Sequence, residues 1–312
     1  MQLTNNTNNT FYSHGYLCTG SWPSTTVQLI VWLLILVFSL TGNVLIIAIF
    51  FRDKTLRTTV NYFIVNMCVS DLIFPIIIIP IWVILDQGKS CLFVAEIYAA
   101  LCKIFSIALG VSVHVSLFSM TALAADRFRA IIFPMKPALF SPNKCCATIT
   151  AMWLSSFAMF LYHAIVSSPG NDSCVDTKST SKELIFVSAF FALICLFAVT
   201  ITVFYLKVAI FLHRQKNSLH LASEVVKKRA KRNRKIITML IIIVILFYVG
   251  WIPFFVMMFN SSAKLPCVYV WLAAYILPVL NPVANPVVYF VFNEKYLQGF
   301  MEILSYLHVI AY

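Results

Sequence analysis

VQLIVWLLILVFSLTGNVLIIAIFF, residues Val27–Phe51, is a run of 25 residues without Lys, Arg, Asp or Glu. A helix needs about 20 mainly apolar residues to cross the roughly 30 Å of hydrocarbon in a bilayer. Lipid offers the backbone N–H and C=O groups no partners, so a chain that crosses it must pair them within its own helix. This run therefore predicts a transmembrane helix.

Six further runs have a comparable length, and one of them, Thr58–Leu85, is interrupted by a single charged residue, Asp71. The other five are Ile104–Ala125, Cys145–Asn171, Leu184–Leu206, Ile236–Ala263 and Leu265–Asn293. Seven such runs predict an all-α membrane protein with a seven-transmembrane helix bundle over residues 27–292. The remaining segments are an N-terminal tail, residues 1–26, and a C-terminal segment, residues 293–312.

The overall composition supports a membrane protein. The 312 residues are 61% hydrophobic and 11% charged, whereas ordinary soluble domains carry about 25% charged residues. A soluble enzyme is excluded because so few charges cannot keep its surface hydrated. A disordered chain is excluded because disorder requires low hydrophobicity and high charge.

The distribution of positive charge predicts the orientation. Of the 23 Lys and Arg residues, 18 lie after the first, third, fifth and seventh runs, and these flanks are expected in the cytoplasm. The N-terminus is then extracellular and the C-terminus cytoplasmic, as for a multi-pass protein of the plasma membrane. Asn5, Asn8 and Asn171 begin glycosylation sequons, and all three fall on the predicted outside.

Asp71 is the carboxylate in the middle of a predicted span, and such a group is by default a functional candidate. Polar residues of other spans are available as its partners: Asn43, Ser112, Ser116, Asn281 and Asn285. Carboxylate, hydroxyl and amide oxygens together suit a hard cation such as sodium. A hydrogen-bonded packing cluster without an ion is the alternative, and the residue chemistry leaves both open.

Short motifs in six spans occur in one order along the chain. They are Gly42-Asn43-Val44, Asn66 with Asp71-Leu72, Cys102 with Asp126-Arg127-Phe128, Trp153, Phe247 with Trp251-Ile252-Pro253, and Asn285-Pro286-Val287-Val288-Tyr289. Through these motifs the chain resembles the rhodopsin-like (class A) G-protein-coupled receptors along nearly its whole length. Tyr296 stands where an aromatic residue begins a short amphipathic eighth helix in that family.

The resemblance implies roles for individual residues. Cys102 and Cys174 would form a disulfide, and Asp71 with its polar neighbours would form a sodium pocket. Residues with roles in activation and in coupling to a heterotrimeric G protein would be Asp126, Arg127, Tyr205, Phe247, Trp251, Pro253, Pro286 and Tyr289. In this scheme Asp126 holds Arg127 at rest, and the sixth span swings outward on activation.

Two departures from the family pattern bear on the resting state. The fifth span contains no proline between Leu184 and Leu206. The inner end of the sixth span is basic, with Arg232 and Arg234, and has no carboxylate that would hold Arg127. We therefore predict a loosely held resting state with some basal signalling.

Carried over by position, the ligand pocket is mainly aromatic and apolar: Trp82, Leu109, Val113, Phe254, Phe255, Met258, Trp271 and Tyr275. Leu109 stands where amine receptors of the family have an aspartate, which argues against a biogenic amine. A peptide of the neuropeptide class is the leading ligand, and a lipid or small apolar molecule is the alternative. A second disulfide could join Cys18 to Cys267, and Cys91 is an alternative partner for either of these two cysteines.

Other functions fit the sequence less well. One mid-span carboxylate with His114 and His163 makes a poor proton relay for a transporter or channel. We expect no enzyme and no catalytic residue, because no nucleophile–base pair or metal triad is apparent, and no cofactor beyond an allosteric sodium ion. The basic segment Lys227–Lys235 indicates contact with anionic membrane lipids rather than with nucleic acid. In the eighth helix, Tyr296, Phe300, Ile303 and Leu304 are expected on the membrane face.

Overall fold

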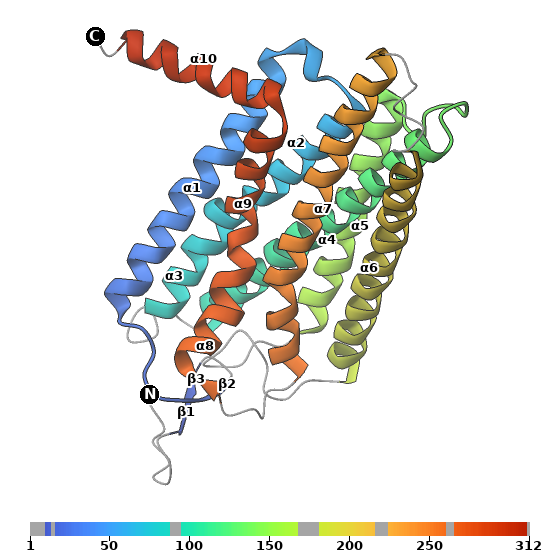
Figure 1. Ribbon diagram of the computed structural model, residues 1–312. Helices are drawn as coiled ribbons and strands as arrows, with labels where there is room; N and C mark the ends of the chain where they lie inside the picture. Colours follow the sequence, from blue (N-terminus) through green and yellow to red (C-terminus); the bar gives the residue numbers. More distant parts are fainter. Residues whose placement is uncertain are drawn as a thin grey trace.

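The computed structural model describes residues 10–13, 16–87, 95–167, 181–215, 224–259 and 265–310. Seven helical segments are long and apolar enough to cross a membrane: Thr25–Arg52, Thr59–Leu85, Glu96–Ile132, Pro142–Val166, Ile185–Gln215, Glu224–Met257 and Cys267–Phe292. They pack as one bundle (Figure 1), as the seven apolar runs predicted. The chain is therefore a multi-pass membrane protein.

Five of the spans are single helices, whereas the second and seventh are each built from two. The single helices are α1 (Thr25–Arg52), α4 (Ala95–Ile132), α5 (Pro142–Val166), α6 (Ser181–Gln215) and α7 (Glu224–Phe259). The second span joins α2 (Thr59–Asp71) to α3 (Ile79–Gln87), and the seventh joins α8 (Cys267–Trp271) to α9 (Leu277–Phe292). A final helix, α10 (Glu294–Ile310), lies across one end of the bundle in Figure 1.

Wide π-helical turns connect the two halves of each divided span, over Phe74–Ile78 and Leu272–Ile276. Pro75 is the second residue of the first turn, and Pro278 follows the second turn closely. Proline lacks a backbone N–H and clashes with the carbonyl four residues before it, which interrupts the regular helical ladder. The prolines of these spans therefore account for the places where the helices widen.

Three short strands lie at the end of the bundle opposite α10, which we call the strand end (Figure 1). Strand β1 (Thr10–Ser13) pairs antiparallel with β2 (Tyr16–Thr19), and β2 pairs in parallel with β3 (Leu265–Pro266). The sheet joins the N-terminal tail to the segment just before α8. These strands were not predicted from the sequence.

Helix α10 is anchored to the bundle by Tyr296, whose side chain is fully buried. Phe300 and Ile303 are partly buried against the same core. The predicted membrane face of this helix is therefore wrong for Tyr296, because that ring is inserted into the bundle. The exposed row consists instead of Leu297, Met301 and Leu304 at helical spacing.

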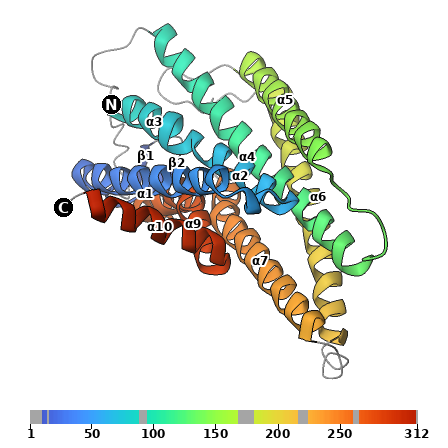
Figure 2. The same cartoon turned by 90° about the horizontal axis from the view of Figure 1, so that it is seen from above.

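Helix α4 runs through the middle of the bundle and packs against α2, α5 and α6 (Figure 2). Its approach to α5 depends on Gly110, because a Cβ atom there would lie 2.1 Å from ring atoms of Phe160. The ring of Phe160 thus occupies the space that any larger residue at position 110 would need.

Gly110→Ala is expected to lower the free energy of unfolding by about 1–3 kcal/mol, the usual cost of overpacking. Phe160→Leu in the same chain should recover part of this loss, because the smaller side chain vacates the contested space. Thermal unfolding of the purified single and double variants measures both effects. Equal unfolding temperatures for the wild type and Gly110→Ala would contradict the packing described here.

Candidate functional site

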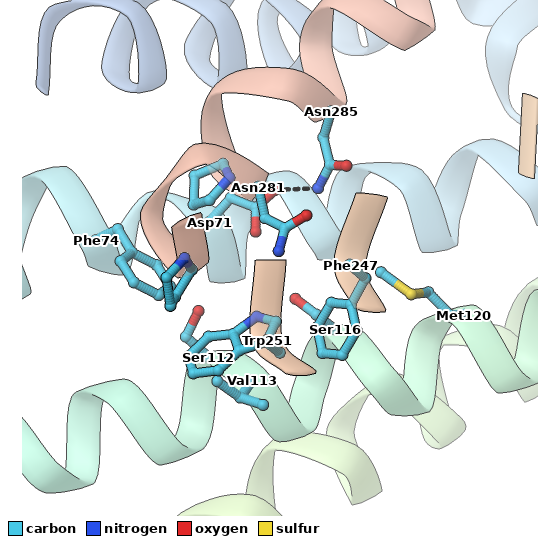
Figure 3. A pocket seen from close by; sticks show the side chains of 12 residues that line it. Asp71, Phe74, Ser112, Val113, Ser116, Met120, Phe247, Trp251, Asn281 and Asn285 are labelled. Atoms are coloured by element: carbon cyan, nitrogen blue, oxygen red, sulfur yellow. Dashed lines mark hydrogen bonds between the residues drawn. The ribbon is translucent and has the colours of Figure 1, made fainter. Parts of the chain in front are cut away.

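A small polar cavity lies in the middle of the bundle, between α2, α4, α7 and α9 (Figure 3). The cavity volume that the centre of a water-sized sphere can occupy is about 10 Å³. This is enough for about one water molecule or small ion. Its lining residues are Asp71, Phe74, Ser112, Val113, Ser116, Met120, Phe247, Trp251, Pro278, Asn281, Pro282 and Asn285.

Asp71 is the charged residue of this cavity and is only 3% exposed. Its Oδ2 accepts a hydrogen bond of 2.8 Å from Nδ2 of Asn285, which is drawn in Figure 3. Within the described residues, Oδ1 of Asn285 and Nδ2 of Asn281 are buried and have no hydrogen-bond partner. Buried polar atoms without partners are costly, so these atoms call for a bound water or ion.

Two hydroxyl groups of α4 face the cavity from the side opposite Asp71 (Figure 3). Both are positioned by Ser70: Ser112 Oγ donates to its carbonyl oxygen at 3.0 Å, and Ser116 Oγ lies 2.9 Å from its hydroxyl. Ser70 was not among the predicted site residues, although it directly precedes Asp71 in the chain. Its two hydrogen bonds join α2 to α4 beside the polar cavity.

The donor set fits a small hard cation. Carboxylate, hydroxyl and amide oxygens are the ligands that such ions prefer, and the site contains all three kinds. Among the described residues, no group of three or more His, Cys, Asp or Glu side chains gathers to hold a metal ion. The cavity therefore suits sodium or water rather than a transition metal.

Asn43, which we predicted as part of this polar set, has a different partner. Its Nδ2 donates to the carbonyl oxygens of Ser39 and Pro282, both at 2.8 Å. Pro286 follows Pro282 by four residues and has no N–H, so the carbonyl of Pro282 lacks its usual helical donor. Asn43 supplies that donor from α1. Gly42 permits the close approach, since a Cβ atom there would lie 2.9 Å from Cβ of Pro286.

Two aromatic side chains of α7 line the cavity (Figure 3). The ring centroids of Phe247 and Trp251 are 6.1 Å apart, and both rings line the cavity. Pro253 lies within the same helix, two residues beyond Trp251. A movement of either ring therefore changes the surroundings of Asp71 directly.

Asp126 and Arg127 form an ion pair near the α10 end of α4. Nε of Arg127 donates to Oδ2 of Asp126 at 3.1 Å, and the two side chains are 18% and 5% exposed, respectively. Tyr205 of α6 is buried. Tyr289 of α9 is fully buried, and its hydroxyl has no hydrogen-bond partner among the described residues.

The predicted ligand-pocket residues separate into two groups. Trp82 and Tyr275 lie near α1, with their ring centroids 5.5 Å apart, and Trp82 also contacts Trp32 at 4.7 Å. The second group surrounds Trp251: Phe254 and Phe255 at centroid distances of 5.6 and 6.1 Å, and Val113 in the polar cavity. Leu109 is partly buried and Trp271 buried in the core, while the side chain of Met258 lies outside the described part.

Cys102 and Cys267 are each disulfide-bonded. Cys18 on β2 pairs with Leu265 on β3, and Leu265 precedes Cys267 by two residues. This register favours the predicted bridge between Cys18 and Cys267. The predicted partner of Cys102, Cys174, lies outside the described residues, as do Cys91 and the sequon residues Asn5, Asn8 and Asn171. These pairings and glycosylation sites stay predictions.

Comparison with known proteins places these features in a family context. Residues 42–289 match the family model described as 7 transmembrane receptor (rhodopsin family). Neuropeptide FF receptor 2 of Mus musculus is 28% identical over 304 residues, which cover 87% of this chain and 70% of that receptor. The RYamide receptor of Drosophila melanogaster is 26% identical over 309 residues, covering 91% and 65% of the two chains. The QRFP-like peptide receptor of Branchiostoma floridae is 26% identical over 308 residues, covering 89% and 77%.

The role of Asn43 gives a test of how α1 is joined to α9. Asn43→Ala should cost about 1–3 kcal/mol of unfolding free energy, because it leaves the Pro282 carbonyl buried without a donor. In a Pro286→Ala background the cost should be smaller, since the new N–H of residue 286 reaches the same carbonyl. Thermal unfolding of the four purified proteins gives the coupling.

Asn61→Ala is the matched control for this cycle. Asn61 is also buried, and its Nδ2 donates to the carbonyl oxygen of Leu56 at 2.7 Å. The loss of unfolding free energy caused by Asn61→Ala should be the same with and without Pro286→Ala. If the loss of unfolding free energy caused by Asn43→Ala is also the same in both backgrounds, Asn43 and Pro286 are not linked.

Proposed function

Because the chain belongs to the rhodopsin family of seven-transmembrane receptors, we propose that it binds an extracellular peptide and activates heterotrimeric G proteins. Receptors with about a quarter of their residues identical to this chain are named for peptides, and this supports a peptide ligand. In the plasma membrane, the strand end faces outward and the α10 end faces the cytoplasm. The predicted orientation from the Lys and Arg residues is the basis for this assignment.

The observation that carries the proposal is the Asp126–Arg127 pair at the cytoplasmic end of α4. At rest, Asp126 holds the guanidinium group of Arg127 against its own helix. When the inner end of α7 moves outward, the guanidinium becomes available to the G protein, with Tyr205 and Tyr289 as neighbouring hydroxyl groups. The ligand shifts this equilibrium only through its higher affinity for the open state.

The polar cavity lies in the middle of the bundle, between the two ends of the receptor. Trp251 contacts both Phe254 and Phe255 and also lines the cavity that contains Asp71, so a ligand that displaces the Trp251 ring would alter the cavity. Asp71, Ser112, Ser116 and Asn285 would hold an allosteric sodium ion there. Bound sodium supplies a positive charge that stabilises the buried carboxylate and favours the resting packing around it.

Arg127→Ala tests the proposed coupling. Cells that express the wild-type chain are screened with a library of peptides, amines and lipids, using a promiscuous G protein as the readout. A peptide should activate the wild type, and Arg127→Ala at equal surface expression should reduce the maximal response by at least about tenfold, because the released guanidinium is absent. Peptide-stimulated signalling that survives Arg127→Ala unchanged would contradict the mechanism, and activation by a lipid alone would contradict the peptide assignment.

Sodium dependence tests the role of the cavity. Replacing N-methylglucamine chloride with sodium chloride at constant ionic strength should raise the unfolding temperature of the purified wild type. A sodium concentration ten times the dissociation constant corresponds to about 1.4 kcal/mol of stabilisation. Asp71→Ala should abolish the difference between the salts, because it removes the charged ligand. An equal salt response in both proteins would place sodium elsewhere.

A further inference from the structure

Lys235 of α7 and Glu294 of α10 form an ion pair across two helices that are far apart in the sequence. Nζ of Lys235 lies 2.9 Å from Oε1 of Glu294, and the two side chains are 38% and 79% exposed, respectively. The hydrogen bond from Lys235 holds the pKa of Glu294 below its usual value, with a smaller effect of the same sign from Lys231. The carboxylate is therefore charged whenever the pair can form.

The pair matters because, within the described part of the chain, α7 makes no ion pair with Arg127. Among the described residues, Arg127 pairs with Asp126 of its own helix, and the inner end of α7 is basic. The acidic residue at the start of α7, Glu224, pairs within its helix with Lys227 at 3.0 Å. Of the ion pairs between described residues, Lys235–Glu294 is the one that joins α7 to another helix.

Glu294 is a fixed point because α10 is docked against α1 and the segment that follows it. Tyr296 is fully buried, and a Cβ atom at Gly299 would lie 2.6 Å from Cγ2 of Ile49. An outward movement of α7 would therefore separate Lys235 from Glu294, whereas α10 would keep its place.

We propose that the Lys235–Glu294 pair is a latch that holds the inner end of α7 against α10 in the resting receptor. This inference rests on the proposed function, in which movement of α7 opens the G-protein site. An exposed ion pair shifts an equilibrium by no more than about fivefold, so this latch is weak. A weak latch accounts for the basal signalling that the basic inner end of α7 predicts.

Charge reversal tests the latch in cells at matched surface expression. Lys235→Glu and Glu294→Lys should each raise ligand-independent signalling about two- to fivefold, because each places like charges together. The exchanged double variant, Lys235→Glu with Glu294→Lys, restores an ion pair and should return signalling to the wild-type level. If both single variants signal like the wild type, or if the exchange fails to restore the basal level, the latch is wrong.

Two variants serve as matched controls. Lys227→Glu reverses a cation on α7 whose partner is within that helix, and Glu302→Lys reverses an acid on α10 whose partner is on α1. Each makes the same change of charge as one test variant and leaves the latch intact. Neither should raise basal signalling, and an increase equal to that of the test variants would assign the effect to net charge alone.

A measurement without G protein separates the latch from the proposed function. Spin labels at Val226→Cys on α7 and Ser305→Cys on α10 report the distance between the helices in the purified receptor, with the exposed Cys146 and Cys195 replaced by Ser. Each single reversal should increase the population at longer distance, and the exchange should reverse it. Identical distributions in all four proteins would overturn the latch. Distances that respond in a receptor that activates no G protein, even with every library ligand, would support the latch and reject the proposed function.

Discussion

The structure depends on one constraint, which is that hydrocarbon offers the peptide backbone no hydrogen-bond partner. Each proline inside a span therefore leaves a backbone carbonyl without its usual N–H donor. A neighbouring residue or a change of helical geometry must compensate for that loss. Near Pro75 and Pro278 the helix widens into a π turn. At Pro286, the freed carbonyl of Pro282 receives its hydrogen bond from Asn43 of another span. The polar interior of the bundle is thus organised around the breaks in its helices.

The same scarcity of partners gives the few charged groups within the bundle their influence. Asp71 has one hydrogen bond from Asn285 and otherwise faces a cavity with room for little more than a water molecule. Asp126 is almost as buried and satisfies its charge with the adjacent Arg127. Neither carboxylate is in a position that packing alone would favour, because an apolar residue would be less costly there. In the proposed function, Asp71 would hold a sodium ion and Asp126 would hold Arg127 at rest.

Much of the fold can be predicted from the sequence, because the backbone hydrogen bonds of a transmembrane helix all lie within one short segment. The apolar runs predict the seven spans, and the resemblance to a known family implies that Asp71 meets polar residues of other spans, as it does in the cavity with Ser116, Asn281 and Asn285. Contacts that depend on helix rotation or on distant pairing were not predicted. Tyr296 is buried rather than lipid-facing, Asn43 bonds a backbone carbonyl, and Lys235 reaches Glu294 across 59 positions. The aromatic residues of the predicted ligand pocket form two groups, one beside Trp32 of α1 and the other beside Trp251.

The small sheet at the strand end has a consequence for how the protein is made. Strand β2 precedes the first span, whereas its parallel partner β3 precedes the last span. Synthesis proceeds from the N-terminus, so the tail must wait until six spans have been inserted before this sheet can close. Closure then brings Cys18 to the neighbourhood of Cys267 at the end of assembly. The sheet is therefore a late step in biogenesis, and its formation reports that the first and last spans have come together.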